Sequence, residues 1–523
     1  MLAVMSGFFL AALDQTIVST ALPTIIRQLN GLSELSWVIT AYLLTSTVVL
    51  PISGKLSDMF GRKKFLLLGI AVFLIGSALS GTSNSMHQLI AFRAVQGIGA
   101  GLLMSNAFAV IGDLFTPIER GKWQGAIASM FGLASVAGPL LGGYLTDTHH
   151  LFGLTTDWRW IFYVNVPIGI LALFLISTFM PHVTQKREKI DYLGATFITG
   201  GLVSLILALS WGGNQYAWRS WQILSMFALA LVFFITFVFV ERKAEAPLLP
   251  LSFFKNPVFR VAAPIVFLFG GAFFGGIIYI PLFKQEVQGA TATGAGLALT
   301  PMVLSIVVVS IAAGQFISRT GRYKILASVG LAVTTVGLIM LSHLGVHTTA
   351  GHMALGMIIT GAGLGVGLPV FNLVVQNAFP QSQLGVSSSS TQLARGLGGT
   401  VGVAALGSVL NNFLVHRLSN LHNNAFVQIA QKTGHGSQVA HLNENSVQGI
   451  LSPQGQQAIT SQLSHLPSQL HPAAMSAYAE FIDKLKVAFV YSIDKVLVVS
   501  AALVAVSFVI SLFLREIPLR HHE

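Results

Sequence analysis

The sequence predicts an all-α integral membrane protein with fourteen transmembrane helices, arranged as two pseudo-symmetric six-helix bundles plus two inserted helices. Three observations predict this fold: the apolar composition, long apolar runs that do not alternate, and a repeated loop motif. Of the 523 residues, 53% are hydrophobic and only 9% are charged, whereas a soluble domain carries about 25% charged residues. This composition excludes a soluble enzyme, a disordered chain and a nucleic-acid-binding protein.

The apolar runs distinguish helices from a membrane barrel. Only helices and closed barrels satisfy every backbone hydrogen bond in lipid. Barrel strands alternate apolar and polar residues, but segments such as FLLLGIAVFLIGSALS at 65–80 do not. Met1 leads almost directly into an apolar run with no basic segment before it, which predicts a retained helix and not a signal peptide.

A helix needs about 20 mostly apolar residues to cross the bilayer. Fourteen runs meet this requirement, at 3–23, 35–56, 65–82, 88–111, 122–145, 160–180, 191–211, 221–240, 258–282, 294–317, 325–345, 352–375, 389–411 and 494–514.

Basic residues predict the orientation, because cytoplasmic loops retain Lys and Arg. With the N-terminus inside, the inner loops hold eighteen of them: Lys55, Arg62, Lys63, Lys64, Arg120, Lys122, Lys186, Arg187, Lys189, Arg242, Lys243, Lys255, Arg260, Arg319, Arg322, Lys324, Arg515 and Arg520. The short outer loops hold only Arg27, Arg159, Arg219 and Lys284. Both termini are therefore expected in the cytoplasm, with an even number of spans.

The long segment 412–490 then lies outside the membrane as a polar extracytoplasmic loop. Its part 473–490 is expected to be helical and to lie against the membrane surface. The segment holds six histidines, namely His416, His422, His435, His441, His465 and His471. Their spacing is irregular and the chain has no cysteine, so no metal site, disulfide or cofactor is expected.

Two loops share one pattern. Residues 54–64 read GKLSDMFGRKK and residues 314–324 read GQFISRTGRYK, each at the predicted cytoplasmic end of a span. The copies lie eight spans apart, which predicts two related six-helix bundles separated by two inserted spans. We expect an N-terminal bundle at 1–180, inserted spans at 181–256 and a C-terminal bundle at 257–523.

The side chains of the first copy indicate a contact between helices. Gly54 and Gly61 allow close approach and positive φ, and Asp58 can accept hydrogen bonds from a helix N-terminus or pair with an arginine. Ser318 replaces Asp58 in the second copy, so a charged latch is expected in one half only.

Five segments resemble the major facilitator superfamily and, within it, the fourteen-span drug:proton antiporter branch. They are GKLSDMFGRKK at 54–64, LIAFRAVQGIGAG at 89–101, GLASVAGPLLGG at 132–143, LDQTIVSTALP at 13–23 and DWRWIFYVNVPIG at 157–169. The resemblance covers nearly the whole chain. It implies that Arg93 modulates a nearby carboxyl during proton transfer, and that the loop with Arg62 and Lys64 is a conformational latch.

Asp14 is the leading candidate for proton coupling. It lies about 16 Å from either end of the first span, where a carboxylate is costly and faces the bundle interior or a wet cavity. Burial favours the protonated form of a carboxyl, so Asp14 can load and lose a proton. The alternative is a structural carboxyl locked to a partner, and for Arg93 the alternative is a side chain that reaches the membrane interface.

Other candidates carry less weight. Polar residues Gln15, Thr16 and Ser19 on the first span are weak candidates to line a substrate cavity. The resemblance implies that glycines and a proline of the fifth span seal and flex the bundle interface; these are Gly132, Gly138, Pro139, Gly142 and Gly143. Asp494 and Lys495 are expected at the interface, Glu286 is expected in a solvated loop, and Arg395 has no acidic partner in its own span.

These features predict a proton-coupled antiporter that exports small hydrophobic or amphipathic compounds from the plasma membrane by alternating access. No GxxxxGK[ST] loop is present, so ATP is not the expected energy source. The expected partners are the lipid bilayer, lipophilic substrates and protons, and the sequence is compatible with a monomer. The alternatives are an exporter of one native metabolite, lipid or siderophore, a membrane-embedded transferase, or a non-transporting sensor or scaffold.

Overall fold

The fold is described from a computed structural model of the full chain. The structure describes residues 1–29, 35–146, 150–151, 154–181, 189–213, 215–290, 292–418, 424, 426–427, 444–451, 453–464 and 471–519. Apart from a two-residue hairpin, β1 (His150–Leu151) paired with β2 (Leu154–Thr155), regular structure in these residues is helical.

The N-terminal half consists of α1 (Leu2–Leu29), α2 (Leu35–Phe60), α3 (Arg62–Gly81), α4 (Met86–Leu114), α5 (Pro117–Thr146), α6 (Trp160–Tyr163) and α7 (Asn165–Phe179). In this half, α4 packs between α2 and α3, and α1 packs between α5 and α7. Only Val164, itself in a helical conformation, separates α6 from α7. Together α6 and α7 form the sixth predicted span.

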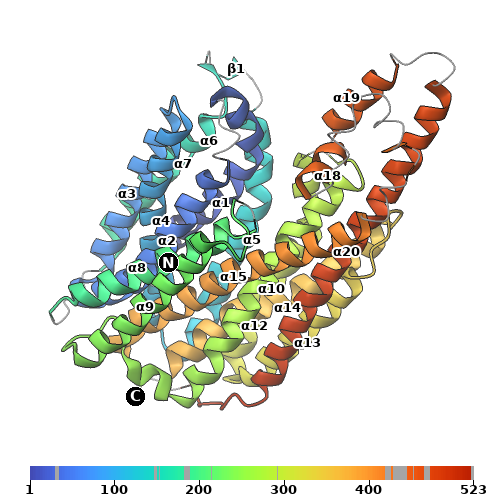
Figure 1. The fold of residues 1–523 in the computed structure, drawn as a ribbon. Coiled ribbons are helices and arrows are strands. Elements are labelled where there is room, and N and C mark those ends of the chain that lie inside the picture. The colour runs from blue at the N-terminus through green and yellow to red at the C-terminus, as the bar shows by residue number, and fades with distance from the viewer. Residues whose placement is uncertain are drawn as a thin grey trace.

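The C-terminal half repeats this arrangement of contacts (Figure 1). Its elements are η1 (Leu251–Lys255), α10 (Pro257–Glu286), α11 (Ala292–Leu297), α12 (Thr300–Thr320), α13 (Lys324–Leu341), α14 (Ala350–Asn377), η2 (Gln381–Gln383), α15 (Leu384–Leu418), α18 (Glu444–Leu451), α19 (Pro453–Ser464) and α20 (His471–Ser511).

The two inserted spans, α8 (Tyr192–Trp211) and α9 (Trp221–Lys243), form a hairpin beside the junction of the halves. The face of α8 that carries Leu202 packs against Val48 of α2 and Leu393 of α15. Helix α9 contacts mainly α8 and leaves large apolar side chains such as Leu231 and Phe239 exposed. Exposed apolar side chains on a long apolar helix are what a lipid environment requires.

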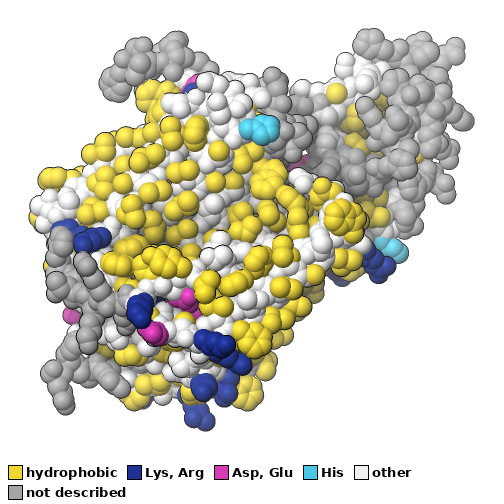
Figure 2. Space-filling model, turned by 60° about the vertical axis from the view of Figure 1, so that its left-hand side comes forward, with side chains coloured by type: hydrophobic (Ala, Val, Ile, Leu, Met, Phe, Trp, Pro, Cys, Tyr) yellow, Lys and Arg dark blue, Asp and Glu magenta, His cyan; other side chains and the backbone are white. Residues whose placement is uncertain are grey.

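Thirteen helices of the described part are long and apolar enough to cross a membrane, and α1 adds the shorter apolar stretch Leu2–Val18. The predicted number of fourteen is consistent with thirteen spans plus α1. Figure 2 shows one face of the molecule, on which apolar side chains cover much of the surface and Lys and Arg side chains gather mainly toward the lower end. We call the end at which α3, α5 and α13 begin and α12 finishes the basic end; it carries Lys64, Lys122, Arg319 and Arg322.

The last helix differs from the prediction. Its start was expected at residue 494, but α20 begins at His471 and continues unbroken for 41 residues. The prediction that 473–490 is helical is confirmed, whereas its placement on the membrane surface is wrong, because this segment continues the axis of the last span (Figure 1). Ala474, Tyr478, Phe481 and Leu485 form a buried stripe at helical spacing that packs within the C-terminal half.

Candidate functional site

Asp14 and Arg93 form an ion pair inside the N-terminal half. Asp14 lies near the middle of α1 and is 0% exposed, and Arg93 of α4 is 2% exposed. Arg93 Nη1 lies 2.5 Å from Asp14 Oδ2. The alternative in which Arg93 extends to the membrane interface is therefore wrong for this structure, because its guanidinium is turned inward to a carboxylate.

Two amide side chains complete the hydrogen bonding of Asp14. Gln96 of α4 and Asn165 of α7 both donate to Asp14 Oδ1, at 2.8 and 3.0 Å. Gln96 Oε1 also accepts from Arg93 Nη1 at 2.7 Å, and Asn165 donates to Ser77 Oγ of α3 at 3.0 Å. We call these five residues the Asp14 cluster; they connect α1, α3, α4 and α7.

Aromatic side chains enclose the cluster. The Arg93 guanidinium lies 4.2 Å from the ring centre of Tyr42 and 5.8 Å from that of Phe162. Tyr42 also donates to the Ala11 carbonyl oxygen at 3.2 Å. These rings exclude water and strengthen the charge interaction inside.

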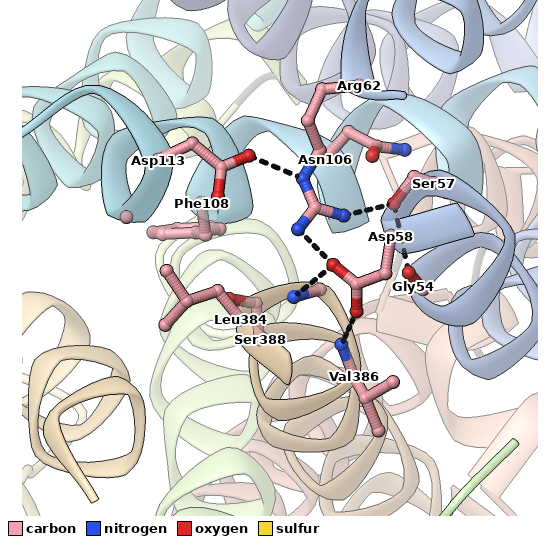
Figure 3. Close-up of polar contacts among 12 residues, drawn as sticks. Gly54, Ser57, Asp58, Arg62, Asn106, Phe108, Asp113, Leu384, Val386 and Ser388 are labelled. Atoms are coloured by element: carbon pink, nitrogen blue, oxygen red, sulfur yellow. Dashed lines mark hydrogen bonds and ion pairs between the residues drawn. The ribbon is translucent and has the colours of Figure 1, made fainter. Parts of the chain in front are cut away.

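The second cluster joins the two halves at the basic end (Figure 3). Asp58, in the last turn of α2, accepts backbone hydrogen bonds from Gly385 and Val386 in the first turn of α15, both at 3.0 Å. Asp58 is also ion-paired with Arg62. Asp58 therefore makes both contacts that were expected for it, with a helix N-terminus and with an arginine. Its carboxylate lies at the positive end of the α15 dipole.

Arg62, at the start of α3, holds this carboxylate in place. Its Nε lies 2.9 Å from Asp113 Oδ2 of α4, and its Nη1 donates to Ser57 Oγ at 2.5 Å. Ser57 Oγ in turn donates to the Gly54 carbonyl oxygen at 3.0 Å. We call Gly54, Ser57, Asp58, Arg62, Asp113 and the first turn of α15 the latch cluster.

The latch cluster depends on close helix contact. A methyl group at Gly54 would lie 2.7 Å from the Gly385 carbonyl oxygen, inside van der Waals contact. Gly61 caps α3 with a φ of 97°, which favours glycine. Lys64 was predicted to belong to the latch, but its side chain is exposed and makes no described bond to the cluster, because it points outward from the first turn of α3.

The second copy of the loop motif makes the matching contact on the other side of the junction. Gly314 of α12 packs against Gly121 of α5, each facing the other's backbone, as Gly54 packs against Gly385. Gly321 has a φ of 67°, like Gly61 in the first copy. Ser318, in the position of Asp58, bonds only within its own helix, to Gln315, among the described contacts.

Helix α5 has glycines on two faces. Gly132 lies against Val303 and Val307 of α12, and a methyl group at Gly138 would lie 3.0 Å from the Ile17 nitrogen of α1. Pro139 lies close to Gly296 of α11, and α5 continues through it without a break. Gly142 is buried and Gly143 is half-buried. One helix thus contacts both halves over much of its length.

The family model described as Major Facilitator Superfamily matches residues 4–403, most of the chain. The chain belongs to the major facilitator superfamily. It is 38% identical to the multidrug transporter protein MdtP of Bacillus subtilis, over 99% of this chain and 93% of that protein. It is 39% identical to multidrug resistance protein 3 of the same organism, over 83% of both chains.

Among solved structures, the fold is similar to that of the proton:xylose symporter XylE, with a TM-score of 0.55 and 17% sequence identity. The match covers 89% of this chain and 95% of that one. This major facilitator chain is thus a multi-pass membrane transporter with two helical halves.

Within this transporter, the candidate cavity residues of α1 have different surroundings. Thr16 donates to the Ala134 carbonyl oxygen of α5 at 2.9 Å and lies against Gly138, so its hydroxyl connects two helices. Gln15 is half-buried. The side chain of Ser19 lies outside the described residues, as do four of the six loop histidines, at 422, 435, 441 and 465.

The sequence did not single out Gln96, Asn165 or Asp113. Gln96 follows Arg93 by three residues and so lies on the same face of α4. This spacing indicates that both side chains can contact one partner, which is Asp14. Asn165 stands inside the DWRWIFYVNVPIG segment, at the junction of α6 and α7. Asp113 ends the apolar run of α4, where an acidic residue resembles an ordinary helix terminus.

Proposed function

We propose that this transporter is a proton-coupled antiporter of the fourteen-span drug:proton antiporter branch. It exports small hydrophobic or amphipathic compounds across the plasma membrane by alternating access, with both termini in the cytoplasm. The names of its Bacillus relatives, a multidrug transporter and a multidrug resistance protein, support a broad substrate range over one native metabolite, lipid or siderophore.

The observation that carries the proton coupling is the fully buried carboxylate of Asp14. In the present conformation it is paired with Arg93 and accepts from two amides, which is the bonding of an ionised carboxylate. A proton on Asp14 removes one charge of the pair and leaves Arg93 with Tyr42 and Gln96. Proton loading therefore weakens the connection of α1 with α4.

Helix α1 transmits this change to the second half. Two residues after Asp14, Thr16 binds the backbone of α5, and α5 packs against α12 through Gly121, Gly125 and Gly132. A shift of α1 relative to α4 thus displaces a helix that contacts both halves. Such a rigid-body motion is the usual route of alternating access.

The latch cluster supports one side of that cycle for the present conformation. Asp58 accepts hydrogen bonds from the start of α15, and Gln124 donates to Gln376 at 2.7 Å, so these contacts join the two halves at the basic end. With the basic end in the cytoplasm, this is the outward-facing state, in which substrate leaves and a proton enters.

The energetics suffice for export. One proton moving inward through about 100 mV releases about 2.3 kcal/mol. At about 1.4 kcal/mol per tenfold change, this supports roughly a fifty-fold substrate gradient.

The test is drug-stimulated proton flux in proteoliposomes with an imposed pH gradient. A lipophilic compound dissipates the gradient in the wild type, and Asp14→Asn abolishes this response because the residue no longer exchanges a proton. Asp157→Asn is the matched control, since Asp157 is a partly exposed carboxyl paired with Arg159 in the same half. It retains the response.

Each other outcome has a defined meaning. An intact response in Asp14→Asn rejects Asp14 as the coupling group. A response to one compound only, across a panel of dyes and drugs, favours a dedicated exporter. No response of the wild type to any compound rejects proton-coupled antiport.

A further inference from the structure

Arg395 is a charged residue inside the C-terminal half that the coupling scheme does not use. It lies eleven residues after the start of α15, which is about 16 Å along the helix and hence near mid-membrane. Ser388, seven residues earlier on the same face, accepts from Gln376 of α14, and Gly399, four residues later, packs on Phe274 of α10. Arg395 therefore faces the space between α10 and α14.

This arginine has no described partner. Its side chain is half-buried, and its Nε is buried without a hydrogen bond. The described helices α10, α12, α13, α14 and α15 contain one acidic residue, Glu286, at the end of α10. Gly270 of α10 packs on the Arg395 backbone. Glu286 lies sixteen residues further along α10, which is about 24 Å from that contact.

The contrast with Arg93 indicates what is missing. Arg93 also lies within a membrane-spanning helix, but its charge is balanced by Asp14 and its guanidinium lies against the Tyr42 and Phe162 rings. A guanidinium stays charged in proteins, and burying it without a counter-charge is costly. A half-buried arginine with no described acidic partner can therefore bind an anion supplied from outside the chain.

Its position fits a ligand that moves between the halves. Gln376 and Ser388, which join α14 to α15, lie one to two turns closer to the basic end than Arg395, where Gln376 also binds the Phe108 carbonyl oxygen of the N-terminal half. The neighbour of Arg395, Gly396, faces Thr47 of α2. Arg395 thus lies just beyond the closed contact of the basic end, at the junction of the halves.

We propose that Arg395 binds the anionic group of an exported amphipathic compound, a carboxylate or a sulfonate. The guanidinium matches the planar, two-oxygen geometry of such groups. This inference rests on the proposed export function and adds a substrate class to it, namely lipophilic anions whose apolar part occupies the space between the halves.

The test uses two probes that differ by one sulfonate: N-phenyl-1-naphthylamine, which is neutral, and 1-anilinonaphthalene-8-sulfonate, which is an anion. Probe-stimulated proton flux in proteoliposomes gives a half-saturating concentration for each. Arg395→Gln raises that concentration for the sulfonate by at least about tenfold, the value of a charge-assisted hydrogen bond, and leaves it for the neutral probe within about twofold. Arg395→Lys, which keeps the charge, restores part of the difference.

Arg417→Gln is the matched control, because Arg417 is an exposed arginine of the same helix that stacks on Tyr491 at 4.1 Å. It changes neither value. The proposal is overturned if Arg395→Gln weakens both probes equally, if it weakens neither, or if the wild type responds to the neutral probe alone. A wild type that responds to neither probe nor to any other compound instead rejects the export function itself.

Discussion

Single residues at helix crossings decide whether the two halves can meet. Asp58 reaches the backbone of α15 because Gly54 and Gly385 let the two helices approach closely; a methyl group at Gly54 would overlap the side chain of Ser389 and the Gly385 carbonyl oxygen. The charge and the two glycines form one contact, since a carboxylate that cannot approach the helix N-terminus gains little from its dipole. Glycine is as necessary there as the acidic residue.

Gly54→Ala tests this contact. The added methyl group would lie 2.7 Å from the Gly385 carbonyl oxygen, whereas the same change at Gly276 of α10 meets no atom within 4 Å. Because forced overlap costs about 1–3 kcal/mol, we expect Gly54→Ala to lower the export rate severalfold in everted vesicles while Gly276→Ala keeps wild-type rates. Equal rates for the two variants would show that closure does not need this contact.

The candidate site was predictable from the sequence residue by residue but not as pairs. Asp14 stands out because a carboxylate in an apolar run is costly, and Arg93 stands out for the same reason. Nothing in the chain states that residues 79 positions apart share a 2.5 Å contact. Gln96 and Asn165 do not stand out in the sequence, because burying a neutral amide costs less free energy than burying a charge.

At the level of elements, the α8–α9 hairpin is fixed to the rest of the protein at its basic end. Glu241 of α9 is 4% exposed and accepts backbone hydrogen bonds from Leu248 at 3.1 Å and Leu249 at 3.4 Å. It thereby folds the connection from α9 to η1. Asp191 caps the start of α8 by accepting from the Gly194 N–H at 2.7 Å.

Glu241→Leu should loosen this connection, because two buried N–H groups then lose their acceptor at a cost of about 1–3 kcal/mol. We expect a lower apparent Tm in detergent for Glu241→Leu and a Tm near the wild type for Glu241→Gln, which keeps an acceptor oxygen. The exposed pair of Lys189 and Glu245, at 2.8 Å, provides the control: Glu245→Gln leaves Tm unchanged. A Tm unaffected by Glu241→Leu contradicts this role.

The sequence predicts the membrane-spanning helices well but places the start of α20 about 23 residues too late. The reason is physical. Hydropathy detects a segment surrounded by lipid, so most spans were placed within a few residues. The first half of α20 packs against protein on one side and carries charges such as Glu480 and Lys484 on the other. Such a segment has the composition of a surface helix, and only its packing reveals that it continues the last span.

At the level of the whole molecule, the orientation proposed from basic residues has a direct test. The chain contains no cysteine, so each introduced thiol is the only one. Ser476 of α20 and Lys64 of α3 are both exposed and lie at opposite ends of the bundle. A membrane-impermeant maleimide therefore distinguishes the two ends.

We expect the maleimide to label Ser476→Cys in intact cells and Lys64→Cys only after the cells are opened, because basic loops remain in the cytoplasm. The cysteine-free protein gives the background in both cases. Labelling of Lys64→Cys in intact cells would reverse the orientation, and with it the assignment of the present state as outward-facing.

The length of α20 has a consequence for the proposed alternating-access motion. Its 41 residues extend about 60 Å, twice the roughly 30 Å hydrocarbon thickness, and α18 and α19 pack near its far end. Because a long helix turns with the half to which it belongs, its far end moves further than the part within the membrane. A fluorophore attached to the far end of α20 would therefore undergo a large displacement during each transport cycle. It would report that motion from a position outside the transport path.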